Sequence, residues 1–84
     1  MKKNMAYVYI LKSIHYSKTY IGSTVNLIKR IEEHNAGYGI YSKRYKPWVL
    51  VYKENFENLS DARKREKYFK SPTGRRFIKK NKLI

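Results

Sequence analysis

Two tyrosine-containing triplets near the N-terminus are the first feature of this chain with chemical potential. Tyr7-Val8-Tyr9 and Tyr20-Ile21-Gly22 are followed along the sequence by Arg30, His34 and Glu66. A deprotonated phenol can act as a base, a guanidinium can hold two phosphate oxygens, and a carboxylate can bind a divalent cation. Hydrolysis of a phosphodiester needs each of these parts, so the residues predict a site for phosphate ester chemistry.

Tyr9, Arg30 and His34 each have an ordinary structural explanation as well. A phenol with a pKa of about 10 is ionised to about one part in a thousand at pH 7, so Tyr9 needs nearby cations or a metal to serve as the base. The alternative is a packing tyrosine, one of nine in the chain. Arg30 is a phosphate clamp or a solvated helix arginine. His34 donates to phosphate, relays a proton, or simply packs at the edge of a helix face.

Glu66 interrupts an apolar helix face. On a helical wheel of about 100° per residue it lies within about 60° of Phe69. A buried, ionised carboxylate without a partner costs several kcal/mol, so the acid requires a reason. One reason is Mg²⁺, which one carboxylate can hold together with water and substrate phosphate. The alternative is an ion pair that draws the acid away from the core, with Arg63, Arg65 or Lys70 as partner.

Positive charge dominates the composition. Twenty Lys and Arg against six acids give a net charge of +14 over 84 residues. Such a density favours a polyanionic partner, DNA or RNA, although a basic surface can also serve solubility alone. A segment from Tyr38 to Lys46 interleaves tyrosines with cations, as nucleic-acid surfaces do. The candidate nucleic-acid contacts are Lys12, Lys29, Tyr41, Lys43, Arg44 and Lys46.

Several classes of protein are disfavoured by what the chain lacks. Cysteine is absent, which rules out disulfides and thiolate zinc sites. The longest apolar stretches hold five residues, too few to cross a bilayer. The basic start Met1-Lys2-Lys3-Asn4 is not followed by a secretory signal pattern. We expect a single cytoplasmic domain over residues 1–84, with no membrane contact and no organic cofactor.

The elements that position these residues can be read from residue preferences and capping signals. Strands are predicted for Ala6–Ser13, Thr19–Ser23 and from Trp48 to between Tyr52 and Asn55, the first two forming a hairpin. Helices are predicted from about Val25 to Asn35 with a cap at Ser23 or Thr24, from a cap at Ser60, and from Ser71-Pro72. Gly37 ends the first helix, and a loop covers Tyr38–Lys46.

The wheel also predicts which side of the first helix is buried. With Leu27 at zero, Ile31, Asn35 and Ile28 lie between about 40° and 100° and form the core-facing stripe. His34, at about −20°, and Arg30, at about −60°, lie along its border. The expected fold is α+β, with a small central three-stranded sheet flanked by helices in the order β-β-α-β-α-α.

Four segments together resemble the GIY-YIG endonuclease family, specifically its small stand-alone bacterial members related to the nuclease module of the UvrC repair protein. The resemblance extends from about Met5 to Lys80. Tyr7-Val8-Tyr9 stands for the first triplet, without its Gly and Ile, and Tyr20-Ile21-Gly22 matches the second. Lys29–Asn35 resembles the helix with the family arginine, and Lys64–Lys67 the segment with the metal-binding glutamate.

This resemblance implies metal-dependent cleavage of the DNA backbone, with a place in DNA repair. Tyr9 would assist a water as base, Tyr20 would orient groups around the phosphate, Arg30 would clamp it, and Glu66 would bind Mg²⁺ or Mn²⁺. Asn81 is the counterpart of an asparagine that closes the site in some relatives. The length leaves no room for a separate DNA-reading domain, so we expect preference for structure or backbone over sequence.

Two other functions are consistent with the same residues. One is a nucleic-acid-binding module, directed at DNA or RNA, that keeps the scaffold without turnover. The other is a protein interaction domain. The acid at position 66 separates the nuclease from both, because neither alternative requires a carboxylate on an apolar helix face.

Overall fold

The computed structural model describes residues 5–83, and the basic N-terminal segment Met1-Lys2-Lys3-Asn4 lies outside them. The elements follow in the order β1 (Ala6–Ser13), β2 (Thr19–Thr24), α1 (Leu27–Ala36), α2 (Ile40–Tyr45), β3 (Trp48–Phe56), α3 (Leu59–Phe69) and α4 (Pro72–Lys80). The strands form one antiparallel sheet in the order β2-β1-β3. Helices flank this sheet, so the predicted α+β class is confirmed.

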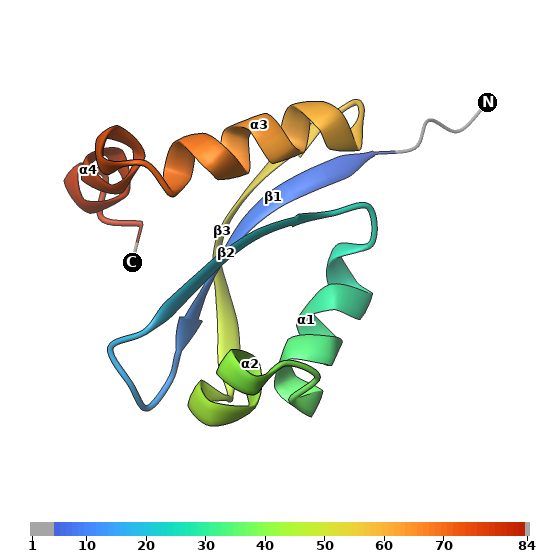
Figure 1. The fold of residues 1–84 in the computed structure, drawn as a ribbon, viewed down its shortest axis with the longest axis vertical. Helices are drawn as coiled ribbons and strands as arrows, with labels where there is room; N and C mark the ends of the chain where they lie inside the picture. The colour runs from blue at the N-terminus through green and yellow to red at the C-terminus, as the bar shows by residue number, and fades with distance from the viewer. Residues whose placement is uncertain (1–4, 84) are drawn as a thin grey trace.

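Strand β1 is buried on both of its faces. Figure 1 shows α3 and α4 on one side of the sheet and α1 and α2 on the other. Successive side chains of a strand point to opposite faces. Val8 and Ile10 therefore pack into a core with Phe69 from α3, while Tyr9 and Leu11 pack into a second core on the α1 side. The central strand thus presents a tyrosine to one helical layer only.

The hairpin fixes which residues lie opposite that tyrosine. Strand β2 pairs with β1 in a register that sets Tyr9 against Gly22 and Leu11 against Tyr20. Tyr20 and Gly22 therefore share the face of Tyr9, whereas Ser23 lies on the opposite face. Within the described part of the chain β2 has no second strand neighbour, so its outer side is a free edge of the sheet.

Asparagines, rather than the predicted serines and threonine, cap two of the helices. The Asn26 side chain accepts a hydrogen bond from the backbone of Lys29, so α1 begins later than a cap at Ser23 or Thr24 would place it. The Asn58 side chain caps α3 in the same way, ahead of Ser60. Each asparagine is as good a cap as the serine near it, so sequence preference alone could not decide.

Two other boundaries agree with the sequence. Ser71 caps α4, with Pro72 in its first turn. Gly37 ends α1 with φ of 79°, a left-handed conformation that glycine adopts without steric cost.

The predicted loop over residues 38–46 contains a helix, α2, and that prediction was wrong. Tertiary contacts hold this short element in place. The indole Nε1 of Trp48 donates to the carbonyl of Ser42 at 3.0 Å, and the Tyr41 hydroxyl donates to the carbonyl of Thr19 at 2.9 Å. Six residues form too short a helix to be stable by propensity alone, so the local sequence carries little signal for it.

The buried side of α1 is also rotated from the prediction. Ile28, expected in the core, is 74% exposed, whereas His34, expected at the border, is only 5% exposed. Leu27 and Ile31, at 0° and about 40° on the wheel, pack against the core next to His34 at about −20°. The buried stripe is therefore centred near Leu27, and Ile28 falls outside it. Within residues 5–83, the helices are all too short or too polar to span a bilayer.

Candidate active site

Tyr9 is the buried centre of the candidate site. Its side chain is 1% exposed and lies on the α1 side of the sheet. Its hydroxyl lies 3.0 Å from Nε2 of His34. The path of the phenol toward the free edge of β2 is open because the residue opposite is glycine: a Cβ on Gly22 would lie 2.5 Å from the Tyr9 hydroxyl oxygen. The glycine of the second triplet is therefore required by the tyrosine of the first.

Tyr20 and His34 form the aromatic wall beside Tyr9. The rings of Tyr9 and Tyr20 are stacked, with centroids 6.2 Å apart and an interplanar angle of 16°. The Tyr20 ring lies 4.3 Å from the imidazole of His34. On the far side of that imidazole, Nδ1 lies 2.6 Å from the Ser42 hydroxyl. Residues from β1, β2, α1 and α2 thus meet at one point.

Arg30 lies on α1, one turn before His34, and its side chain reaches this cluster. Hydrogen bonding to the Tyr9 hydroxyl raises the pKa of Arg30, more than burial lowers it, and interactions with Glu33 and Tyr20 raise it further. The guanidinium also pairs with Glu33 at 3.1 Å. Its side chain remains 43% exposed, so a phosphate can approach it from solvent.

Glu66 comes to the cluster from the other side of the sheet. It lies on α3, where its Oε1 accepts the Ser23 hydroxyl at 2.5 Å and its Oε2 pairs with Lys70 at 2.7 Å. Its side chain is 23% exposed. The predicted ion pair is therefore present with Lys70, one of three suggested partners. Because the charge of Glu66 contributes to raising the pKa of Tyr9, the carboxylate lies within electrostatic reach of the phenol.

The two central groups are both neutral at pH 7. Burial raises the pKa of Tyr9 to about 12, although the neighbouring Arg30 lowers it. Arg30, the neighbouring cation, therefore does not outweigh burial at this phenol. Burial also lowers the pKa of His34, and the charge of Arg30 lowers it further. A neutral imidazole has one nitrogen that accepts, so the Tyr9 hydroxyl can donate to Nε2 in the tautomer that carries its proton on Nδ1.

A divalent metal fits the donor set at Glu66. No cluster of three or more His, Cys, Asp or Glu side chains exists among residues 5–83. Mg²⁺ does not need one, because it commonly takes one or two carboxylates and completes its shell with water and phosphate oxygens. Glu66 is half-buried, with Ser23 on Oε1 and Lys70 on Oε2, so it could hold a metal only once the Lys70 ammonium moves off Oε2.

The other predicted site residues are more dispersed. Lys12 on β1, Lys29 on α1 and the three cations of the 38–46 segment are exposed. Asn81 ends α4, where its side-chain amide donates to the Phe77 carbonyl of the same helix at 2.9 Å. Of the predicted nucleic-acid contacts, Tyr41 alone lines the cleft described next.

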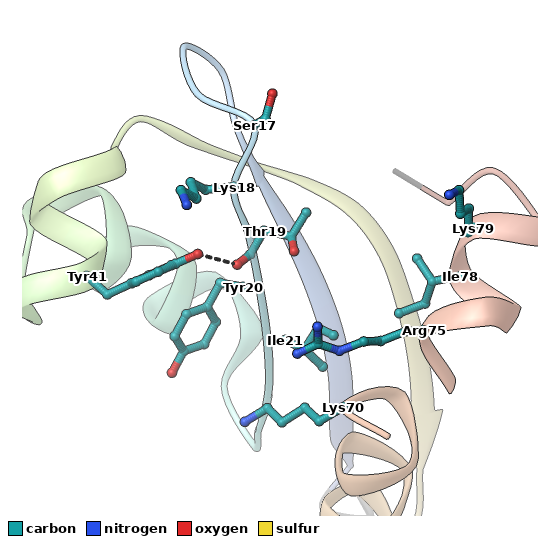
Figure 2. A pocket seen from close by; sticks show the side chains of 10 residues that line it. All are labelled: Ser17, Lys18, Thr19, Tyr20, Ile21, Tyr41, Lys70, Arg75, Ile78 and Lys79. Atoms are coloured by element: carbon teal, nitrogen blue, oxygen red, sulfur yellow. Dashed lines mark hydrogen bonds between the residues drawn. The ribbon is translucent and has the colours of Figure 1, made fainter. Parts of the chain in front are cut away.

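A cleft of about 830 Å³ opens beside the tyrosines along the edge of β2 (Figure 2). Its cations are Lys18, Lys70, Arg75 and Lys79, none of which was predicted from the sequence as a nucleic-acid contact. The spacing of Arg75 and Lys79, one turn apart on a single helix, was a usable signal. The position of α4 beside β2 could not be predicted from the sequence, because it depends on tertiary packing.

Comparison with known proteins shows the family of this chain. Residues 5–82 match the family described as the GIY-YIG catalytic domain. The chain is 42% identical over 82 residues to a UPF0213 protein of Pediococcus pentosaceus, covering 93% of this chain and 85% of that protein. It is 50% identical over 70 residues to a UPF0213 protein of Clostridium perfringens, covering 82% and 74%. The chain therefore belongs to the GIY-YIG catalytic domain family.

Proposed function

We propose that this chain is a metal-dependent endonuclease that hydrolyses DNA phosphodiester bonds and selects its substrate by shape or backbone more than by sequence. Its family is a family of nucleases, and the relatives named UPF0213 carry no activity in their names. What supports catalysis in this chain is that Tyr9, Tyr20 and His34 lie together on one face of the sheet, with Arg30 beside Tyr9 and the Glu66 carboxylate close enough for its charge to raise the pKa of Tyr9.

The proton chemistry of the proposal begins from a neutral Tyr9. With a pKa of about 12, ionising this phenol outright at pH 7 would cost about 7 kcal/mol. A concerted transfer avoids that cost. The Tyr9 oxygen accepts a proton from the attacking water while the phenolic proton passes to Nε2 of His34, 3.0 Å away. The water becomes a hydroxide that attacks phosphorus, and His34 becomes an imidazolium.

The remaining residues position the substrate phosphate and the Glu66 carboxylate. Arg30 binds two non-bridging oxygens through its planar fork, and Tyr20 orients the water against the phosphate. The Ser23 hydroxyl donates to Oε1 of Glu66 and so fixes the position of this carboxylate. A Mg²⁺ or Mn²⁺ ion on Glu66 would neutralise charge on the phosphate and stabilise the leaving oxygen.

A second candidate function is a nucleic-acid-binding module for DNA or RNA without turnover. Two observations favour it. The Lys70 ammonium already holds Glu66 Oε2 at 2.7 Å, and the pKa of Tyr9 is raised instead of lowered. Under this function metal and Glu66 have no effect on any readout, whereas nucleic-acid affinity falls steeply with salt.

Nicking of supercoiled plasmid, followed on gels with Mg²⁺, Mn²⁺ or EDTA, tests the two candidates. The endonuclease proposal expects metal-dependent nicking that falls about 10²-fold or more in Glu66→Gln and Tyr9→Phe, with DNA affinity retained. The matched control is Glu32→Gln, an exposed acid on α1, which should nick as the wild type does. If the wild type binds flap, fork, single-stranded and duplex DNA but cuts none of them with either metal, the binding module is the better description.

A further inference from the structure

The cleft beside the candidate site is open, cationic and partly aromatic. It follows the free edge of β2 between α2 on one side and α4 on the other (Figure 2). Its functional groups are the cations Lys18, Lys70, Arg75 and Lys79 and the tyrosines Tyr20 and Tyr41. No Asp or Glu lines it.

The charge of this cleft is not balanced by the protein. Within residues 5–83, Lys18, Arg75 and Lys79 form no ion pair with a carboxylate. Arg75 and Lys79 lie one turn apart on α4, and like charges at that spacing destabilise a helix. A polyanion in the cleft would relieve this repulsion and release its own counterions on binding.

The cleft and the candidate active site share two residues. The Tyr20 ring lines the cleft and also lies 4.3 Å from the imidazole of His34. The Lys70 ammonium lines the cleft and also pairs with Glu66 at 2.7 Å. In Figure 2 these two side chains lie toward one end of the cleft, and Ser17 and Lys79 lie toward the other. A chain molecule lying in the cleft would therefore lead directly to the carboxylate.

Tyr41 gives the cleft a rigid stacking surface. One face of its ring is stacked on Trp48, with centroids 5.7 Å apart and planes at 22°. Its hydroxyl is fixed by the carbonyl of Thr19 at 2.9 Å, and 42% of the residue is exposed. An aromatic ring held in this way offers its exposed part to a base without losing further conformational freedom.

The backbone of β2 adds donors to the same wall. The Lys18 carbonyl accepts from Ser13 of β1, whereas the next carbonyl, that of Thr19, faces α2 and accepts from Tyr41. In an antiparallel ladder successive residues alternate in this way, so the N–H of Ile21 is turned toward the free edge. A phosphate oxygen can use that N–H.

From these observations we propose that the cleft binds the DNA strand that continues from one side of the scissile phosphate. Lys18, Arg75 and Lys79 contact its phosphates, and a base stacks on Tyr41. The inference rests on the proposed function only for the position of the scissile phosphate, since strand binding by the cleft does not require cleavage. It assigns to α4 a role in substrate binding that is separate from the five residues proposed to carry the chemistry.

A pair of matched double variants tests the proposal. Arg75→Gln/Lys79→Gln removes two cations from the cleft side of α4. Arg76→Gln/Lys80→Gln removes the same two residue types, at the same spacing, from positions on α4 that do not line the cleft. Affinity for a fluorescent DNA oligonucleotide is measured by anisotropy between about 50 and 200 mM salt, in EDTA so that no cleavage occurs. Thermal unfolding checks that all variants are folded.

The expected result is a loss of about tenfold or more in affinity for the cleft pair only. The slope of log affinity against log salt should also become shallower for that pair, by about 0.7 to 0.9 for each phosphate that the protein no longer neutralises. Tyr41→Leu should weaken binding without changing the slope, because base stacking releases no counterions.

Equal losses of affinity and slope in the two pairs would overturn the inference, because the charge of α4 would then act without regard to the cleft. The inference would also be overturned, in favour of a protein partner, if an acidic peptide bound the cleft while the cleft pair kept the DNA affinity of the wild type. If the cleft pair alone weakens binding but the wild type never nicks DNA, the cleft proposal holds and the endonuclease proposal fails.

Discussion

The Ser42 hydroxyl lies 2.6 Å from Nδ1 of His34, so helix α2 supports the imidazole from behind while Tyr9 contacts it from the front. A hydrogen-bond partner on one ring nitrogen decides whether the other nitrogen carries a proton. With the Nδ1 proton donated to Ser42, Nε2 is left as the acceptor for the Tyr9 hydroxyl. The segment that the sequence predicted to be a loop therefore positions the proposed proton acceptor.

Ser42→Ala should slow nicking and destabilise the protein. The change leaves a buried ring nitrogen without its partner, which costs about 1 to 3 kcal/mol, and frees the imidazole to adopt the other tautomer. The free energy of unfolding and the pH profile of nicking measure the two effects. Ser13→Ala is the matched control, because Ser13 is equally buried and its hydroxyl donates to the Tyr45 carbonyl at 2.6 Å. It should lose stability without shifting the profile, and an identical shift in both variants would argue against the role of Ser42.

Gly22→Ala should abolish nicking with a modest loss of stability. The added Cβ would lie 2.5 Å from the Tyr9 hydroxyl oxygen and 2.7 Å from Cζ, so the phenol must move away from His34. Overpacking of this kind costs about 1 to 3 kcal/mol. At Gly39, by contrast, a Cβ would meet no atom closer than the Ser42 hydroxyl oxygen at 3.9 Å, and Gly39→Ala should remain active. Full activity of Gly22→Ala would show that the position of Tyr9 does not matter.

Stability should fall as the pH drops below about 6.5 because of His34. Burial lowers the pKa of this imidazole from its ordinary value of 6.5, so the unfolded chain binds a proton more readily than the folded protein does. The stabilisation is therefore complete above about pH 6.5 and is lost as the pH falls, with a slope of at most about 1.4 kcal/mol per pH unit. Urea unfolding at several pH values measures it. His34→Gln should flatten the curve in this range, whereas replacement of the exposed His15 by Gln should leave it unchanged.

Arg65→Lys should destabilise the protein by about 1 to 3 kcal/mol without affecting the site. The Arg65 guanidinium holds Glu54 through two hydrogen bonds, at 2.8 and 3.2 Å, and stacks 4.6 Å from the Phe69 ring centroid. Lysine keeps the charge but loses the fork and the stacking. Arg63→Lys, exposed on the same helix, should change stability by less than about 0.5 kcal/mol. Thermal unfolding of both variants decides, and equal stability would mean that the fork contributes nothing.

Sequence reasoning was accurate where one strand or helix determines its own boundaries. The strand Ala6–Ser13 has the predicted bounds, because an uninterrupted run of β-branched and aromatic residues suits a strand buried on both faces. The left-handed end of α1 at Gly37 and the Ser71-Pro72 start of α4 follow from local stereochemistry. The predicted apolar face of α3 is confirmed by buried Phe69, with Glu66 half-buried beside it.

It failed where distant contacts decide. Ser42 carries no local sign that its hydroxyl would contact His34, and α2 depends on bonds to Trp48 and Thr19 from other elements. The raised pKa of Tyr9 could not be foreseen, because burial opposes the nearby cation and only the packing shows which is larger. The roles of the predicted site residues stay predictions until the nicking assays are made.

The free edge of β2 exposes an unpaired strand, and such strands recruit other strands into aggregates. Lys18, Arg75 and Lys79 surround it with like charge, and the Tyr41 hydroxyl occupies the carbonyl of Thr19. A second copy approaching this edge would be repelled before its backbone could pair. The protein would therefore be least soluble when these cations are neutralised and no polyanion takes their place. The cations that we propose to bind DNA would thus also prevent aggregation through the edge of β2.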